Sequence, residues 1–353
     1  MVYVNKFIKN TERIFPEQGR YTAKRYDMNE NPEGLPKEFV DSVLKEITPE
    51  FLSIYPEPDK FLNKYAKYIG KGTTKENYMA TNGSDMAIRY LLETFGEVGK
   101  DVVTVTPSFE MYAVNCSILG LHHVAVAYND DLTIDVDNIL KAINENTRVV
   151  VLLNPNNPVG NVYSEEELKK IIAKAAENNA IVIIDEAYHY FYPNTFIDHA
   201  LQDDNVVVLR TFSKLFSIAA CRLGVIISKK ENIHYLMNAK LTFDANSIAL
   251  LFGERILDHP ELIDELIRIE NEGKKYTFDS LKEHGYSYRD CRGNFIFIEP
   301  HHDAKNVAER LEKEENVLVH PYGNPVLKKY LRVSIGSAKA MKIFLDAFYR
   351  IDA

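Results

Sequence analysis

Short runs of β-branched and other apolar residues recur along the first two thirds of the chain, with helix-like polar segments between them. Each run is continuously apolar, a pattern typical of strands that are buried on both faces of a mainly parallel sheet. The runs are Val102–Val105, Val124–Ala127, Val149–Leu153, Ile181–Ile184, Val206–Leu209 and Val225–Ile227. They predict a sheet of at least this many strands.

The segments between the runs contain helix signals. Ser164 is followed three residues later by Glu167, a capping box in which both side chains satisfy free backbone N–H groups. An amphipathic run through Ile171, Ile172 and Ala175 comes next. Strands that alternate with helices predict an α/β fold, a mainly parallel sheet flanked by helices.

The pattern changes after Ser247. A helix-like stretch rich in Leu, Ile and Glu is followed by further strand and helix patterns, which predict a smaller α+β domain. These segments are Pro260–Lys275, Cys291–Pro300, Ala304–Glu315, Val317–His320 and Leu331–Ile335. We therefore expect an N-terminal arm (1–35), a large domain (36–246) and a small C-terminal domain (247–353).

Composition narrows the class of protein. The 353 residues carry a net charge of −9, which argues against a general nucleic-acid binder, because such proteins need clustered Lys and Arg. The three cysteines are odd in number and form no CxxC pair, so we expect free thiols in a reducing compartment and no metal site. No apolar stretch is long enough for a membrane helix, and no secretory signal is visible. A cytoplasmic location is expected.

Polar clusters follow the apolar runs, at the sheet edge where α/β proteins bind ligands. They are Asn154–Gly160, Asp185–Tyr188 and Arg210–Lys214, with Arg222 a few residues later, and Thr81–Asp85 opens a helix near the first strand. Taken singly, these are ordinary turns, helix caps and surface charges. Together they supply an amine, a carboxylate, an amide, a phenol, an arginine and hydroxyls beside a helix N-terminus. That inventory is what pyridoxal phosphate requires.

At this point the chain resembles the fold-type I aminotransferases, and its motifs are most similar to those of the histidinol-phosphate aminotransferases. The matching motifs occur in the same order over about residues 21–337. They are Asn-Glu-Asn-Pro-x-Gly (29–34), Tyr-Pro (55–56), Asn-Pro-Asn-Asn-Pro-x-Gly (154–160), Asp-Glu-Ala-Tyr (185–188), Thr-x-Ser-Lys (211–214) and Leu-Arg-Val-Ser-Ile-Gly (331–336).

The resemblance implies a role for each matched residue. Lys214 would bind the cofactor aldehyde and then carry protons at the substrate α-carbon, and Asp185 would pair with the pyridine nitrogen. Asn157 and Tyr188 would contact the ring oxygen, and Phe109 would stack on the ring where the family usually has tyrosine. The phosphate would be held by Ser84, Asp85, Thr211, Ser213 and Arg222.

The family also implies a homodimer, since its counterpart of Tyr55 reaches the cofactor phosphate of the neighbouring subunit. Arg332 would receive the substrate carboxylate or phosphate, with Asn29 and the arm residue Tyr21 nearby. The chain departs from the family at His320, where a second substrate-binding arginine is usual. Histidine lacks the arginine fork and is charged only where its pKa or a partner favours the protonated form. When protonated it could recover part of the lost contact; the alternative is that it simply packs at a strand end.

These residues imply an aminotransferase that moves an amino group from glutamate to a small phosphorylated ketone. Dihydroxyacetone phosphate is the first candidate acceptor. A decarboxylase of serine or threonine phosphate is the alternative, because related decarboxylases share the cofactor residues.

Other classes fit less well. No GxGxxG follows a first strand, and Gly96–Asp101 lacks the P-loop spacing, so neither a nicotinamide enzyme nor a P-loop NTPase is expected. The adjacent pairs His122-His123 and His301-His302 would point to opposite faces of a strand, which disfavours a metal site. A non-catalytic binding protein would have lost the lysine or its partners.

Overall fold

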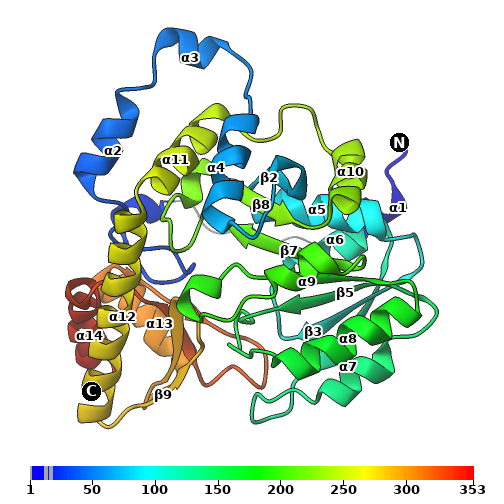
Figure 1. Cartoon of the computed structure of the whole chain (residues 1–353). Coiled ribbons are helices and arrows are strands. Elements are labelled where there is room, and N and C mark those ends of the chain that lie inside the picture. Colours follow the sequence, from blue (N-terminus) through cyan, green and yellow to red (C-terminus); the bar gives the residue numbers. More distant parts are fainter. Residues whose placement is uncertain (1, 12–14, 16–18) are drawn as a thin grey trace.

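The centre of the molecule is a seven-stranded sheet (Figure 1). The computed structural model describes residues 2–11, 15 and 19–353. The strands of this sheet are β2 (Tyr78–Asn82), β3 (Asp101–Thr106), β4 (His122–Ala127), β5 (Thr147–Leu153), β6 (Ile181–Asp185), β7 (Val206–Thr211) and β8 (Leu223–Ile227). Their order is β2-β8-β7-β6-β5-β3-β4, and strands β3 to β7 pair in parallel. The predicted mainly parallel sheet is therefore confirmed.

One end of the sheet differs from the prediction. Strand β8 runs antiparallel to both β7 and β2, and β2 is absent from the predicted set. Its sequence, Tyr-Met-Ala-Thr-Asn, has one short apolar stretch and leads straight into a helix, so no strand pattern stands out. The prediction placed Thr81 and Asn82 at the start of that helix.

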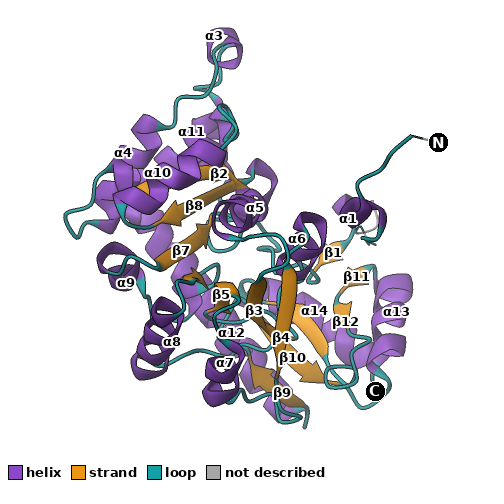
Figure 2. Ribbon diagram, turned by 90° about the vertical axis from the view of Figure 1, so that its right-hand side faces the viewer, coloured by secondary structure: helices purple, strands orange, loops and turns teal. Residues whose placement is uncertain are grey.

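Helices cover both faces of the sheet (Figure 2). One core contains side chains from α5 (Gly83–Phe95), α6 (Met111–Leu119) and α10 (Lys230–Ala239). The core on the other face contains side chains from α4 (Asp59–Ile69), α7 (Val136–Ala142), α8 (Glu165–Glu177), α9 (Ile197–Gln202) and α11 (Ser247–Asp258).

Strand β5 shows why the apolar runs are continuous. Val149 and Val151 pack into the first core, whereas Val150 and Leu152 pack into the second. Successive side chains of a strand point to opposite faces, so a strand covered on both sides needs apolar residues at every position.

The C-terminal part of the chain builds a second, four-stranded sheet of order β12-β13-β10-β9. Its strands are β9 (Ser287–Asp290), β10 (Phe295–Glu299), β12 (His320–Pro321) and β13 (Leu331–Ser334), and its neighbouring pairs are antiparallel. It shares a core with residues of α12 (Pro260–Glu283), α13 (Ala304–Glu315) and α14 (Ala338–Ile351). In the arm, β1 (Lys24–Arg25) pairs with β11 (Val317–Leu318).

The long helix α12 runs from α11 down along α14 (Figure 1). At Gly273 it passes so close to the turn after β13 that a Cβ atom would lie 1.8 Å from the carbonyl oxygen of Gly336. A glycine is needed at this crossing. No helix in the described part of the chain is long and apolar enough to cross a membrane.

The remaining elements are short. Helices α2 (Lys37–Leu44) and α3 (Pro49–Ser53) stand out from the body of the molecule (Figure 1). The others are α1 (Lys6–Lys9) and the 3₁₀ turns Arg20–Thr22, Lys75–Asn77, His189–Phe191 and Ala219–Cys221. The expected N-terminal arm includes residues 1, 12–14 and 16–18, which lie outside the described residues.

Candidate active site

A cavity of about 610 Å³ lies at the carboxyl ends of β5, β6 and β7. It brings together all of the residues that the sequence singled out except Tyr21 and Tyr55. These are Asn29, Ser84, Asp85, Phe109, Asn157, Asp185, Tyr188, Thr211, Ser213, Lys214, Arg222, His320 and Arg332. They come from both sheets and from the arm, so the cavity lies where these three parts of the fold meet.

Lys214 follows β7 and reaches into this cavity. Its Nζ donates a hydrogen bond to the carbonyl oxygen of Met28 at 3.0 Å. Burial, and secondly the positive charge of Arg332, lower the pKa of Lys214 to about 8. Near neutral pH this amine therefore has a substantial neutral fraction, which an amine needs to act as a nucleophile or a base.

Asp185 ends β6 and is buried, with 3% of its surface exposed. Its Oδ2 accepts a hydrogen bond from the Tyr112 hydroxyl at 2.9 Å, and its Oδ1 accepts one from the Ala187 amide at 3.1 Å. Burial raises the pKa of Asp185 to about 6, although both hydrogen bonds oppose that rise. A buried carboxylate held by neutral donors is suited to a cationic N–H partner.

The N-terminus of α5 faces Arg222. The Nη2 of Arg222 donates to Asp85 Oδ2 at 2.9 Å, and Arg222 itself has a left-handed backbone with φ of 60°. A Cβ atom on Gly83, whose φ is +73°, would lie 2.5 Å from that same Nη2. The glycine thus lets the guanidinium lie against the first turn of the helix. With Ser84, Thr211 and Ser213 in the same wall, this region can bind a phosphate dianion.

Two amide–side-chain pairs form the opposite wall. Asn29 Nδ2 donates to the Tyr188 hydroxyl at 2.9 Å, and burial raises the pKa of Tyr188 to about 12. Arg332 Nη1 donates to Asn157 Oδ1 at 3.0 Å, and its Nη2 donates to the carbonyl oxygen of Asp27 at 2.5 Å. The Nε of Arg332 is buried and makes no hydrogen bond of normal geometry among the described residues, although the guanidinium interacts with the nearby Tyr322 hydroxyl.

His320 lies beside Arg332 on the neighbouring strand β12. Desolvation by its neighbours, followed by the charge of Arg332, lowers the pKa of His320 to about 4, although Asp27 acts in the opposite direction and the residue keeps an exposed surface. A neighbouring arginine disfavours the imidazolium form, so the neutral form of His320 is favoured. At this position the chain offers a neutral imidazole.

Tyr21 and Tyr55 lie outside the cavity. Tyr21 is 95% exposed and Tyr55 is 71% exposed. Tyr55 stacks on Phe243 with ring centroids 4.2 Å apart. Within one chain neither tyrosine is close enough to the cavity to line it, so their expected roles stay predictions.

Two residues of the site were missed from the sequence. Tyr112 donates to Asp185, and Tyr322 lines the cavity with a buried hydroxyl that makes no hydrogen bond of normal geometry among the described residues. Tyr112 comes three residues after Phe109, about one helical turn, which is a signal that could have been used. Tyr322 lies in the segment after β12 and carries no such signal.

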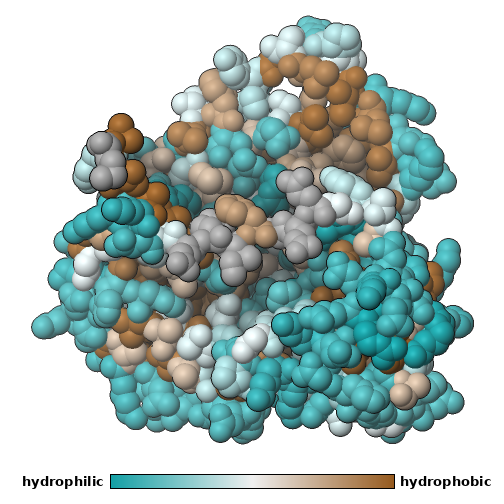
Figure 3. Space-filling view, turned by 180° about the vertical axis from the view of Figure 1, so that it is seen from behind, coloured by the Kyte–Doolittle hydropathy of each residue, from teal (hydrophilic) through white to brown (hydrophobic). Residues whose placement is uncertain are grey.

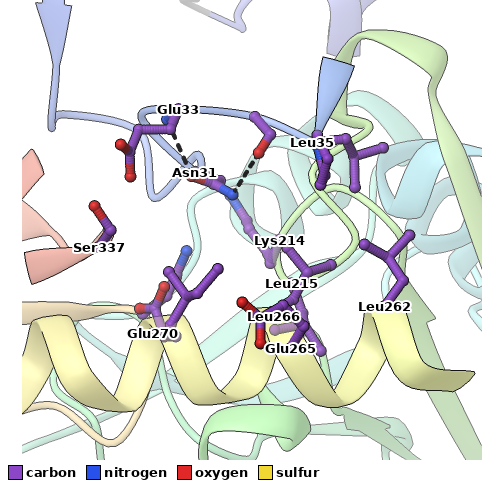
Figure 4. Close-up of a pocket in the computed structure, with 15 residues that line it drawn as sticks. Asn31, Glu33, Leu35, Lys214, Leu215, Leu262, Glu265, Leu266, Glu270 and Ser337 are labelled. Atoms are coloured by element: carbon purple, nitrogen blue, oxygen red, sulfur yellow. Dashed lines mark hydrogen bonds between the residues drawn. The ribbon is translucent and has the colours of Figure 1, made fainter. Parts of the chain in front are cut away.

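A smaller cavity of about 290 Å³ also has Lys214 in its wall (Figure 4). Glu265 and Glu270 of α12 line it together with Glu33 of the arm. Glu270 is buried, its Oε1 has no partner among the described residues, and burial raises its pKa well above the usual range. Burial therefore favours the neutral form of this carboxyl.

The arrangement of the larger cavity fits pyridoxal phosphate. It presents a reactive amine on Lys214, a buried carboxylate on Asp185 and an aromatic ring on Phe109. The niche at Gly83, which a side chain would fill, places Arg222 beside a helix N-terminus for the phosphate.

Comparisons with known proteins agree with this chemistry. Residues 27–348 match the family model described as aminotransferase class I and II. The chain is 32% identical over 331 residues to a histidinol-phosphate aminotransferase of Caldanaerobacter subterraneus, covering 93% of this chain and 92% of that protein. It is 31% identical to the enzyme of that name from Clostridium kluyveri, covering 98% of each.

Solved structures show the same fold. Histidinol-phosphate aminotransferase from Sinorhizobium meliloti, solved in complex with pyridoxal-5'-phosphate, superposes with a TM-score of 0.87 at 20% identity, covering 99% of this chain and 98% of that one. Aspartate aminotransferase from Thermus thermophilus with maleate gives a TM-score of 0.78 at 18% identity, covering 99% and 100%.

Proposed function

The chain belongs to the aminotransferase class I and II family and is a pyridoxal-phosphate enzyme, and we propose that it moves an amino group from glutamate to a small phosphorylated ketone. The observation that carries this proposal is the cavity itself. It combines the amine of Lys214 with two separate arginines, Arg222 beside α5 and Arg332 on β13. One arginine serves the cofactor phosphate and the other serves an anionic group of the substrate.

Each residue has a task around the bound cofactor. When bound, pyridoxal phosphate supplies an electron-accepting ring that stabilises negative charge at the substrate α-carbon. Asp185 keeps the ring nitrogen protonated. Asn157 and Tyr188 hold the ring oxygen, and Phe109 covers the ring. The phosphate is held by Ser84, Asp85, Thr211, Ser213 and Arg222, with Asp85 acting by fixing the Arg222 guanidinium at 2.9 Å.

Lys214 would have a second task once the amino group of the substrate has displaced it from the cofactor. The freed Nζ would take the proton from the substrate α-carbon and deliver it on the far side of the substrate nitrogen, and hydrolysis by water would then leave the substrate as a ketone and its amino group on the cofactor. A pKa of about 8 suits both directions, because a proton shuttle works best near the operating pH.

The role of Asp185 can be tested by Asp185→Asn. An amide cannot hold the ring nitrogen in its protonated form, so the cofactor stays bound while the reaction slows. The loss falls on kcat rather than on KM, since the missing charge acts in the transition state. A variant with near wild-type rates would remove Asp185 from this role.

The part of the cavity around Arg332, where we expect the substrate to bind, offers one cation and two neutral groups. Arg332 supplies a buried Nε and Tyr322 a buried hydroxyl that interacts with this guanidinium, while the pKa of His320 is lowered to about 4, which favours its neutral form. Such a set suits one carboxylate or one phosphate next to a reacting ketone. Dihydroxyacetone phosphate has these two features, so it is our first candidate acceptor. Asn29, which adjoins Tyr188, completes this wall.

A second candidate acceptor is imidazole-acetol phosphate, the ketone of the histidinol-phosphate reaction. The names of the relatives favour it. The lack of a second arginine at His320 should weaken binding of the phosphate of either ketone, because an arginine contact to a dianion contributes about 1.5–3 kcal/mol, or 10–150-fold in binding.

Kinetics with wild type and His320→Arg would decide between the acceptors. We expect glutamate to convert the bound cofactor to its amine form, which is visible by absorbance and which a decarboxylase of serine or threonine phosphate would not do. We also expect His320→Arg to raise kcat/KM for histidinol phosphate by about 10–150-fold. Efficient wild-type turnover of histidinol phosphate, unimproved by the substitution, would overturn the choice of acceptor. No conversion by glutamate would overturn the donor.

A further inference from the structure

Tyr112 does not line the cavity but contacts the Asp185 carboxylate, which does. It is the second residue of α6, it is 2% exposed, and its ring belongs to the core that α5, α6 and α10 share with the sheet. Its hydroxyl donates to Asp185 Oδ2 at 2.9 Å. The ring is fixed by packing, so the hydroxyl has little freedom to point elsewhere.

The two oxygens of Asp185 are held by donors of different origin. Oδ1 accepts from the amide of Ala187, which belongs to the same turn of chain. Oδ2 accepts from Tyr112, which lies 73 residues earlier and on another element. The contact from Tyr112 therefore fixes the carboxylate relative to the sheet and α6, and not only relative to its own loop.

We propose that Tyr112 is a positioning residue that aims the Asp185 carboxylate at the cofactor's ring nitrogen and keeps it ionised. The inference rests on the proposed role of Asp185. The acidic groups near Asp185 are Asp85 on α5 and the adjacent Glu186, and both disfavour its charged form. A donor is needed to offset them.

A tyrosine suits this task better than a lysine or an arginine. A cation at this position would stabilise the carboxylate but would also repel the protonated ring nitrogen. Burial raises the pKa of Tyr112 well above its usual value, so its hydroxyl keeps its proton and remains a neutral donor at every working pH. Tyr188, the other phenol near Asp185, is engaged with Asn29.

The test is Tyr112→Phe, which removes the hydroxyl and leaves the ring in place. Asp185 should then be protonated at a higher pH. We expect the acid limb of the glutamate half-reaction to move up by about one pH unit, with KM for glutamate unchanged. The pyridoxal phosphate dissociation constant of the apo-enzyme, followed by fluorescence across the same pH range, should rise with the same pH dependence. Thermal unfolding checks that the variant is folded.

Two further variants separate positioning from general loss of packing. In an Asp185→Asn background, Tyr112→Phe should change cofactor affinity by less than twofold, since its effect passes through the carboxylate. Tyr163→Phe removes another buried hydroxyl, from the core on the other face of the sheet, and should shift neither pH profile.

The outcomes are distinct. An unshifted Tyr112→Phe profile, or an equal effect of that change with and without Asp185, would overturn the role of Tyr112. If Asp185→Asn itself left the half-reaction unchanged, the proposed function would fail instead.

Discussion

Lys214 is the only lysine among the described residues that line the larger cavity. No other side chain there can therefore supply its amine. Lys214→Ala should abolish both turnover and the absorbance of lysine-bound pyridoxal phosphate, since no covalent link can form. Absorbance spectroscopy of the purified holoenzyme checks this. Lys240→Ala is a matched control, because burial also lowers the pKa of Lys240, which lies outside the cavity. If Lys214→Ala kept the absorbance, the assignment of the site would be wrong.

Glu270 gives a prediction about stability. Its folded-state pKa is raised by burial, so it favours folding at pH values below about 4.5, its unfolded value, and this contribution is lost as pH rises through the folded pKa. Glu270→Gln cannot ionise. The variant should therefore gain stability relative to wild type as pH rises above about 4.5, as measured by denaturant unfolding at several pH values.

Glu265→Gln on the same helix is the control for Glu270. Glu265 is exposed and its pKa is lowered by Arg268, so the sign of its pH effect is opposite and its size is small. A stability difference between wild type and Glu270→Gln that does not change with pH would contradict the neutral, buried state of Glu270.

At the scale of elements, a buried ion pair fixes the loop that carries Tyr188. Glu186 accepts from Arg210 of β7 at 2.8 Å, from the Thr195 hydroxyl and from the Phe196 amide. Glu186 is fully buried and Arg210 is 6% exposed. The pair therefore ties residues 186–196 to the sheet beside the cavity.

Removing one partner of the Glu186–Arg210 pair should lower the stability of the protein strongly. Arg210→Met leaves the Glu186 charge buried without a counterion, and we expect it to lower the free energy of unfolding by about 3–5 kcal/mol. Arg350→Met breaks the surface pair with Glu315 and should cost much less, because solvent screens such a pair. Urea unfolding of both variants checks the difference. Equal losses in the free energy of unfolding would show that the buried pair stabilises the fold no more than the surface pair does.

The helices and strands show which parts of the fold can be predicted from the sequence. All six apolar runs are strands, and the Ser164–Glu167 capping box opens α8 as predicted. These features are local, so periodicity and capping reveal them. The antiparallel course of β8 was not predictable, because pairing direction depends on the whole topology.

The site also contains some features that are local in the sequence and others that depend on the whole topology. Motif residues such as Lys214 and Asp185 were identified because each follows an apolar run. The contact of Tyr112 with Asp185 joins residues 73 apart, and the pKa of His320 depends on Arg332 across two strands. No window of the sequence contains such information.

The whole molecule has an apolar surface that one chain leaves uncovered. Figure 3 shows hydrophobic residues gathered at the top of one face, over α2, α3 and α11. The exposed apolar residues of these elements and of the loops next to them are Leu44, Leu52, Ile54, Tyr55, Phe243 and Ile248. Helices α2 and α3 project from the body and form no core of their own. A contiguous apolar surface of this kind marks a site of protein–protein contact.

We therefore expect a homodimer whose interface includes this surface and brings Tyr55 to the cofactor phosphate of the neighbouring subunit. Leu52→Glu with Ile54→Glu should give a monomer by sedimentation, since two buried, unpaired carboxylates would oppose association. Tyr55→Phe should leave the dimer intact and raise the cofactor dissociation constant by about 10–150-fold, because one hydrogen bond to a charged group contributes about 1.5–3 kcal/mol. Val98→Glu changes another exposed apolar residue outside this surface and should affect neither quantity. A wild-type monomer with full activity, or a Leu52→Glu/Ile54→Glu monomer with full cofactor affinity, would show that each chain completes its own site.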